Sequence, residues 1–133
     1  LPVCLNDLIT MDIIMATSIL DREILALMRR ESETAILPRL ANLKAGEVED
    51  KGGNDPVTIA DREAEAILSE QLAKLAQGLA IVGEEAAHTD PGVLERLGAP
   101  CWIVDPLDGT TNFAAGRGPF GIMIARAEGG LAQ

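Results

Sequence analysis

The chain has 133 residues, of which 47% are apolar and 24% are charged, and its formal net charge is −10. This composition is typical of one soluble globular domain, or of part of a larger one. The negative charge argues against nucleic acid or an anionic membrane surface as the main partner, since both attract basic patches. It suits a site that gathers carboxylates around a cation, although a solvated acidic surface accounts for most of the excess.

The cysteines and the single histidine exclude several kinds of site. Cys4 and Cys101 are far apart and form no CxxC pair, so we expect free thiols. His88 stands alone in a polar segment, which leaves a zinc site or a Ser-His-Asp triad without support. With no apolar run of about 18 residues and no basic secretory leader, we expect a cytoplasmic protein. The first residue is Leu1 and not Met, so upstream residues could be missing.

The N-terminal third predicts one long helix from about Ile9 to Glu33. Its apolar residues recur at steps of three and four, which places them on one face. They are Ile9, Ile13, Ala16, Leu20, Ile24 and Leu27. Asp7 or Thr10 could cap the start, and Pro38 lies just beyond the expected end. The segment 42–54 is polar and contains three glycines, so we expect a loop.

A second helix is predicted from near Ile59 or Asp61 to Ala76, with Gly78 ending it. Its expected apolar face consists of Ala64, Ile67, Leu68, Leu72 and Leu75. Short buried strands follow at Leu79–Val82, Cys101–Val104 and Phe120–Ala127, and a hairpin turn at 128–130 leads into a strand at 131–133. The stretch 86–100 reads as a surface loop with a helical turn near Val93–Leu97. The elements predict an α+β fold.

Carboxylates follow two of these strands. Glu84 comes after the first strand and Asp105 after the second. Neighbouring strands lie about 5 Å apart, so the two side chains could share a cation. Asp108, beyond the turn at Pro106, could fold back so that Asp105 bridges two ions. Divalent ions about 3.5–4 Å apart serve phosphoryl hydrolysis. Each acid alone could be a turn or capping residue, whereas the set favours a metal site.

The residues after Asp108 add groups suited to a phosphate. The amides of Gly109 and Thr110 could bind phosphate oxygens at the start of a short helix over 110–115. The Thr110 hydroxyl could orient an attacking water if a base accepted the proton, and Asp61 is a candidate for that base. The alternative for Asp61 is an ordinary helix N-cap.

Three other phosphate-handling motifs are excluded. A DxDGT nucleophile of haloacid-dehalogenase phosphatases would need an aspartate two residues before Asp108, where Pro106 stands. The sequence also contains no GxxxxGK[ST] and no GxGxxG, so nucleotide-binding loops of these types are absent.

Three motifs together identify a family. They are DPLDGTTNF at Asp105–Phe113, VGEE at Val82–Glu85 and DPVTIAD at Asp55–Asp61, about 20 residues apart. In type, order and spacing they resemble the signatures of the inositol monophosphatase family of Mg²⁺-dependent, lithium-sensitive phosphatases. The resemblance covers essentially the whole chain, but members of the family are about twice as long.

The resemblance implies that residues 1–133 form the N-terminal, metal-binding half of a layered αβαβα sandwich, with two helices on a mostly antiparallel sheet. The absent half normally carries a W-D-x-A-G motif whose aspartate completes the second metal site, together with the loops that select the alcohol. Without that half, we expect apolar sheet surface to be exposed. Full-length members are commonly homodimers.

The resemblance also implies residue roles. Glu84, Asp105 and the Leu107 carbonyl would hold one Mg²⁺, and Asp105 and Asp108 a second. Thr110, paired with Asp61, would activate the nucleophilic water. The substrate phosphate would lie against Leu107, Gly109 and Thr110. Lys51 falls where the family often has a basic residue near the site, and Glu85 would support the site without binding metal.

The implied activity is hydrolysis of inositol monophosphate or a related sugar or cyclitol phosphate, with no phosphoenzyme. Three alternatives within enzymes remain open, namely histidinol-phosphatase, fructose-1,6-bisphosphatase and 3′-phosphonucleotidase activities. A non-catalytic fragment or regulatory module that retains the fold is the alternative from another class, and the sequence leaves open whether this chain alone is active.

Overall fold

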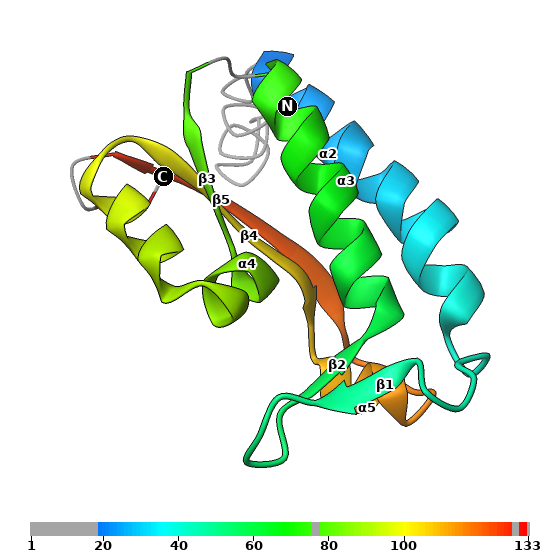
Figure 1. The fold of residues 1–133 in the computed structure, drawn as a ribbon. Helices are drawn as coiled ribbons and strands as arrows, with labels where there is room; N and C mark the ends of the chain where they lie inside the picture. The colour runs from blue at the N-terminus through cyan, green and yellow to red at the C-terminus, as the bar shows by residue number, and fades with distance from the viewer. Residues whose placement is uncertain (1–18, 76–77, 129–130, 133) are drawn as a thin grey trace, which may run out of the picture.

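The computed structural model describes residues 19–75, 78–128 and 131–132 (Figure 1). In chain order the elements are α2 (Ile19–Glu31), the π turn η1 (Ser32–Ile36), the 3₁₀ turn η2 (Leu37–Arg39), β1 (Val48–Asp50), β2 (Pro56–Thr58), α3 (Ile59–Leu75), β3 (Ala80–Gly83), α4 (Glu84–Thr89), the 3₁₀ segment η3 (Pro91–Gly98), β4 (Cys101–Asp108), α5 (Thr110–Ala114), β5 (Gly121–Glu128) and β6 (Leu131–Ala132).

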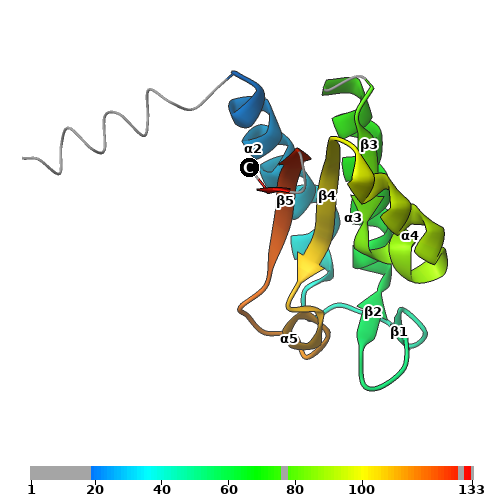
Figure 2. The ribbon, with the colours of Figure 1, turned by 90° about the vertical axis from the view of Figure 1, so that its left-hand side faces the viewer.

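The predicted α+β class and the mostly antiparallel sheet are confirmed. Four strands are arranged in the order β3-β4-β5-β6, and β1 and β2 form a separate antiparallel pair. Only β3 and β4 are parallel, while β4 with β5 and β5 with β6 are antiparallel. Helices α2 and α3 run side by side across one face of the larger sheet (Figures 1 and 2).

The core between these helices and the sheet follows from side-chain periodicity. Alternation along β4 directs Trp102 and Val104 toward the helices, while Cys101 and Ile103 face the other side. The cluster facing the helices comprises Ile24, Leu27, Leu68, Leu72, Trp102 and Val104, all buried. On the opposite face η3 and α4 cover the part beside β3, and Met123 on β5 remains 51% exposed.

The first predicted helix is confirmed in its second half and extended at its end. Ile24 and Leu27 face the core as expected, whereas Ile9, Ile13, Ala16 and both proposed caps lie outside the described residues. After Glu31 the backbone continues as a π turn and then a 3₁₀ turn that includes Pro38. Proline lacks an N–H, so it suits the start of a turn better than a helix interior.

The second predicted helix is confirmed as α3, with one error on its face. Ala64, Leu68 and Leu72 are fully buried, but Ile67 is 36% exposed. A residue next to a core position on a helix is rotated about 100° from it, so Ile67 lies at the edge of the buried stripe. The prediction that Ile67 is buried was wrong because it relied on the apolar character of the residue alone.

Two segments predicted as loops contain regular structure. The segment 42–54 includes β1, which pairs with β2 through Val48↔Thr58 and Asp50↔Pro56. The segment 86–100 includes most of α4 and the 3₁₀ segment η3, and η3 bears out the expected helical turn. The pattern signal was weak because all three β1 residues are exposed and α4 has no buried residue.

Strand β4 is longer than predicted. It continues through Asp105 to Asp108, with a shift of register against β5 between these two residues. Asp105 therefore lies within the strand and not after its end. The sequence signal misled because Pro106 suggested a turn, whereas a register shift accommodates a residue that cannot donate a ladder hydrogen bond. None of the described helices is long and apolar enough to cross a membrane.

Candidate functional site

The two carboxylates predicted to share a cation do lie together. Strands β3 and β4 are adjacent and parallel, with Gly83 opposite Val104, so the next residues Glu84 and Asp105 emerge side by side. Burial raises the pKa of Asp105 to about 6, and the charge of Glu84 and a hydrogen bond to it add to the shift. Two neighbouring carboxylates repel each other when both are ionised, so the pair attracts positive charge.

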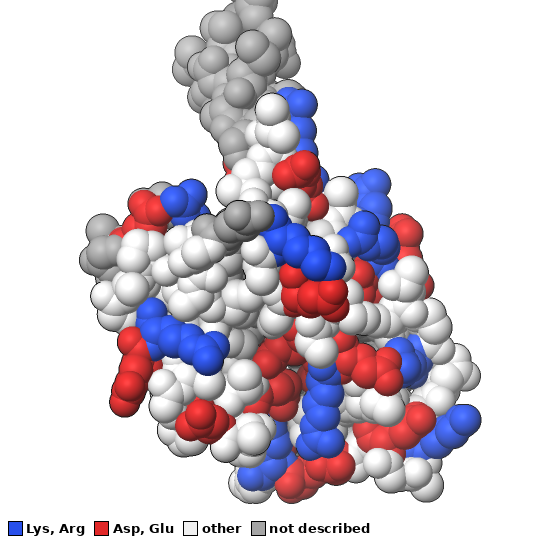
Figure 3. Space-filling model, turned by 45° about the horizontal axis from the view of Figure 1, so that its top comes forward, with Lys and Arg blue, Asp and Glu red and all other residues white. Residues whose placement is uncertain are grey.

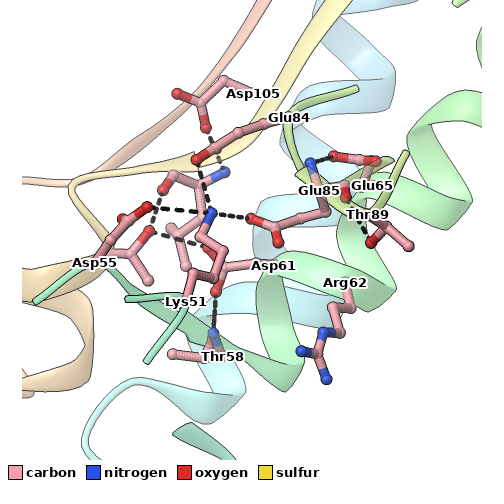
Figure 4. Close-up of polar contacts among 12 residues, drawn as sticks. Lys51, Asp55, Thr58, Asp61, Arg62, Glu65, Glu84, Glu85, Thr89 and Asp105 are labelled. Atoms are coloured by element: carbon pink, nitrogen blue, oxygen red, sulfur yellow. Dashed lines mark hydrogen bonds and ion pairs between the residues drawn. The ribbon is translucent and has the colours of Figure 1, made fainter. Parts of the chain in front are cut away.

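The ammonium of Lys51 supplies positive charge beside this pair (Figure 4). Its Nζ lies 3.1 Å from Glu84 Oε1, 3.0 Å from Glu85 Oε1 and 3.8 Å from Asp55 Oδ2. The Lys51 side chain is 6% exposed. Burial alone would lower its pKa, but the hydrogen bonds and charges of Glu85 and Glu84 outweigh burial and raise it. The β1–β2 hairpin, predicted to be a loop, carries Lys51 to this position.

Asp61 connects the start of α3 to the residues after β4. Its Oδ2 accepts hydrogen bonds from the Thr58 amide at 2.7 Å and the Thr58 hydroxyl at 2.5 Å, while Thr58 Oγ1 accepts from the Ala60 amide at 3.2 Å. This is a capping-box arrangement with Thr58 before the helix and Asp61 in its first turn. Asp61 is therefore part of the cap without being the N-cap residue itself.

The second oxygen of Asp61 serves another contact. Thr110 Oγ1 lies 3.0 Å from Asp61 Oδ1 and 2.8 Å from the Leu107 carbonyl oxygen. Asp61 is fully buried, and burial raises its pKa while the hydrogen bonds from Thr58 and Thr110 work against that rise. The structure thus brings the predicted pair Thr110 and Asp61 together. The Leu107 carbonyl has a second lone pair, so its contact with Thr110 does not prevent it from binding another group.

The turn before α5 requires glycine. Gly109 has φ +85°, and a Cβ there would lie 2.7 Å from the Pro119 carbonyl oxygen. Asn112 Nδ2 donates to the same carbonyl at 2.9 Å, which binds the segment before β5 to α5. This close packing fixes the Gly109–Thr110 backbone beside Leu107.

The donor set fits a hard divalent cation only in part. Carboxylate and carbonyl oxygens are the ligands that Mg²⁺ prefers. Burial is the main cause of the raised pKa of Asp105, and the neighbouring charge of Glu84, which a cation would offset, adds to it. Across the ranges 19–75, 78–128 and 131–132, however, no group of three or more acidic, histidine or cysteine side chains could hold a metal. Asp108 is exposed and does not complete a three-carboxylate set with Glu84 and Asp105, so the ligand set stays a prediction.

Sequence reasoning missed one buried acid in this region. Glu65 lies four residues after Asp61 on the same face of α3 and is only 7% exposed. It accepts hydrogen bonds from the amides of Glu85 and Ala86. The i, i+4 spacing from Asp61 was the available signal, since it places both acids on one side of the helix.

The surface charge is mixed. On the face in Figure 3, acidic and basic side chains are interspersed and form no single large patch of one sign. The net charge of −10 is therefore spread over the surface as well as gathered at the strand ends. A chain of this kind offers no basic patch on that face for a polyanion.

Comparison with known proteins decides the family. A profile described as the Inositol monophosphatase family matches residues 21–133. The chain belongs to the inositol monophosphatase family. This is the family that the three sequence motifs predicted. The chain combines the VGEE motif with adjacent strands β3 and β4 and with a contact between Thr110 and Asp61.

Among curated relatives, an inositol-1-monophosphatase of Rhizobium meliloti is 45% identical over 75 residues, which cover 56% of this chain and 27% of that protein. The Nus factor SuhB of Vibrio cholerae is 37% identical over 97 residues, covering 72% and 34%. In both cases the match spans about a third or less of the relative.

Solved structures of the family share the fold. The IMPase of Thermotoga maritima aligns with a TM-score of 0.69 and 32% identity, covering 85% of this chain and 41% of that one. The extragenic suppressor protein SuhB of Bartonella henselae aligns with a TM-score of 0.60 and 32% identity, covering 83% and 41%. The chain thus corresponds to less than half of each solved relative, in the N-terminal portion of the fold.

Proposed function

We propose that this chain is the N-terminal, metal-binding portion of a Mg²⁺-dependent phosphomonoesterase that hydrolyses inositol monophosphate or a related sugar or cyclitol phosphate. The observation that carries the proposal is the hydrogen bond between Thr110 and Asp61, 49 residues apart in sequence. This pair lies beside Asp105 of β4 and Glu84, which follows β3, so a hydroxyl, a buried base and cation-attracting carboxylates are assembled in one place.

The groups assigned to the metal ions are the carboxylates of Glu84, Asp105 and Asp108 and the carbonyl of Leu107. When bound, Mg²⁺ would neutralise phosphoryl charge and make a coordinated water more acidic. The incomplete three-carboxylate set is consistent with a site that needs a ligand from another part of the protein, as the relatives' greater length allows.

Within the chain, the Thr110 hydroxyl orients the attacking water and Asp61 receives its proton. Burial raises the pKa of Asp61, which makes the carboxylate a stronger base than an exposed aspartate. The amides of Gly109 and Thr110 hold the phosphate, and water displaces the alcohol directly as the P–O ester bond breaks. Lys51 stays paired with Glu84 and Glu85, where it limits repulsion among the acids.

The test is release of inorganic phosphate from inositol 1-phosphate, with and without Mg²⁺ and with Li⁺ added. It uses the 133-residue chain and a chimera in which this chain replaces the aligned portion of the Thermotoga maritima IMPase. We expect Mg²⁺-dependent, lithium-sensitive release from the chimera. A folded chimera without activity would contradict the proposal, because the C-terminal groups are then present.

A non-catalytic module that retains the fold is the second candidate. The described residues lack a three-carboxylate metal set, and the match covers 41% of each of the two solved relatives cited above. An active chimera together with an inactive chain would assign the deficiency to missing parts and not to these residues. A panel of histidinol phosphate, fructose 1,6-bisphosphate and a 3′-phosphonucleotide separates the enzyme alternatives.

Two further properties belong to the same proposal. We place the protein in the cytoplasm, since Cys101 is a free and fully buried thiol that suits a reducing compartment. We also propose that the full-length form is a homodimer. Fractionation and the oligomeric state of the longer protein would test these statements.

A further inference from the structure

We propose that Glu65 is a positioning residue, whose buried carboxylate sets the direction of Glu84 and Glu85 by binding the start of α4. The inference rests on the proposed function, because it concerns how the same acidic site is built. It assigns a role to a residue on a different helix from the acids that it orients.

The geometry is a clamp between two helices. The amide of Glu85 donates to Glu65 Oε2 at 2.7 Å, and the amide of Ala86 donates to Glu65 Oε1 at 2.8 Å. Figure 4 shows Glu65 directed at the start of α4. The first amides of a helix have no partner within it, and Gly83, which precedes α4, has no side chain to supply one. The Glu65 carboxylate on α3 acts as the capping acceptor for these amides.

The clamp acts on the side chains that form the site. Glu84 and Glu85 are the first two residues of α4, so fixing the amides of Glu85 and Ala86 fixes the backbone that carries both carboxylates. Glu84 is thereby held near Asp105 and Lys51, and Glu85 near Lys51. A short helix of six residues with no buried residue has little packing of its own to hold this direction.

The choice of an acid is costly for the fold, which argues against a purely structural cap. Burial raises the pKa of Glu65, the hydrogen bonds from the Glu85 and Ala86 amides work against that rise, and the charges of Glu85 and Glu84 add to it. A neutral side chain would avoid this repulsion. A carboxylate, however, offers two acceptor oxygens in one plane, and it accepts both amides at once.

The residue at 83 is matched to this clamp. A Cβ at Gly83 would lie 2.3 Å from Glu65 Oε1 and 2.4 Å from its Cδ. Gly83 has φ −93° and ψ 149°, which any residue adopts, so glycine is needed here for space and not for backbone conformation. The buried Glu65 carboxylate therefore explains why glycine stands at position 83 of the VGEE motif.

The test compares two ways of disturbing the clamp, each with a matched control. Glu65→Gln keeps size but leaves one oxygen acceptor, and Gly83→Ala displaces the Glu65 carboxylate without backbone strain. Glu70→Gln changes an exposed acid of the same helix that pairs with Lys74, and Gly98→Ala adds a methyl group where nothing lies within 4 Å. Circular dichroism and thermal unfolding check that each 133-residue variant is folded.

The first readout is the Mn²⁺ affinity of the same substitutions made in the chimera with the Thermotoga maritima IMPase, measured by the loss of the free-ion electron paramagnetic resonance signal. Residues that orient metal ligands contribute about 10–100-fold to affinity, so Glu65→Gln and Gly83→Ala should weaken Mn²⁺ binding by at least about tenfold. Both controls should bind like the wild type. Unchanged affinity in a folded Glu65→Gln protein overturns the inference.

The second readout needs no metal. In the wild type, the Glu85 and Ala86 amide protons should exchange slowly and resonate at low field. Glu65→Gln keeps one acceptor oxygen, so at least one of the two amides should lose both features. Fast exchange of both amides in the wild type, or two unchanged amides in a folded Glu65→Gln chain, overturns the inference whatever the metal result. Absent Mn²⁺ binding by the unsubstituted chimera with the expected amide behaviour instead contradicts the metal site of the proposed function.

Discussion

Helix α3 contacts two regions of different chemistry, an apolar region against the middle of β4 and an acidic region near the start of the helix. At the apolar end, Leu68 and Leu72 of α3 pack on Trp102 and Val104 of β4. At the acidic end, the same helix buries two carboxylates, Asp61 and Glu65, beside the small apolar residues Ala60 and Ala64. Helix α3 thus changes from core element to site element within two turns.

The apolar region of α3 stabilises the fold, whereas the acidic region lowers stability and serves the proposed site. Burial of apolar side chains favours folding, by about 25 cal/mol for each Å² removed from water. Burial of Asp61 and Glu65 raises the pKa of each, which means that their ionised forms oppose folding. Acids with strongly shifted pKa values are concentrated at functional sites in proteins.

The largest effect is expected from Asp105→Asn in the chimera. Loss of the carboxylate shared by both proposed metal ions should reduce turnover by about 10³-fold, comparable to removing a main electrostatic group from other active sites. Phosphate release at saturating Mg²⁺ measures it, and the exposed Asp90→Asn serves as the control. Near-normal activity of Asp105→Asn would remove the two-metal assignment.

Leu68→Ala should destabilise the apolar region of α3 without changing the arrangement of the acidic region. Leu68 is fully buried, so we expect a loss of about 2–5 kcal/mol in the free energy of unfolding. The neighbouring Ile67→Ala is the control, because Ile67 is 36% exposed and should cost less than about 1 kcal/mol. Urea denaturation measures both, and equal losses would show that the core boundary on α3 is wrongly drawn.

Thr110→Ala should act on the chemistry and not on the metal. Without the hydroxyl that contacts Asp61, kcat of the chimera should fall by about 10²-fold while the half-saturating Mg²⁺ concentration stays nearly constant. Thr110→Ser should recover most of the rate, and the exposed Thr111→Ala should match the wild type. An unchanged kcat would exclude Thr110 from the mechanism.

The smallest effect is a pH dependence of stability caused by Asp61. Its pKa in the folded state is raised above the ordinary value of 3.8, so the folded state binds the proton more tightly than the unfolded state. The resulting stability is fully present below pH 3.8 and is lost as the pH rises through the folded pKa. Asp61→Asn should flatten this slope in metal-free urea titrations, whereas Glu70→Gln should not. A slope unaffected by Asp61→Asn would contradict the direction.

Sequence reasoning predicted which candidate site residues lie together better than it predicted the local structure around them. Glu84 and Asp105 were expected side by side, and the parallel register of β3 and β4 confirms that placement. Asp61 was a candidate base for Thr110 from the residues and was paired with it by the family resemblance, and the structure confirms their contact. The exposed hairpin that carries Lys51 was missed, because strands without an apolar face leave no alternation in the sequence.

The sequence by itself determined the family, the α+β class and the pair of acids, Glu84 and Asp105, that lie side by side, because short motifs and apolar periodicity are local properties of the chain. Tertiary structure alone decided that Glu65 reaches across from α3 to α4 and that Lys51, expected near the site only from the family resemblance, pairs with Glu84 and Glu85. Both depend on contacts between residues 20 and 33 positions apart. Such contacts are set by how helices and strands pack, and no local pattern records them.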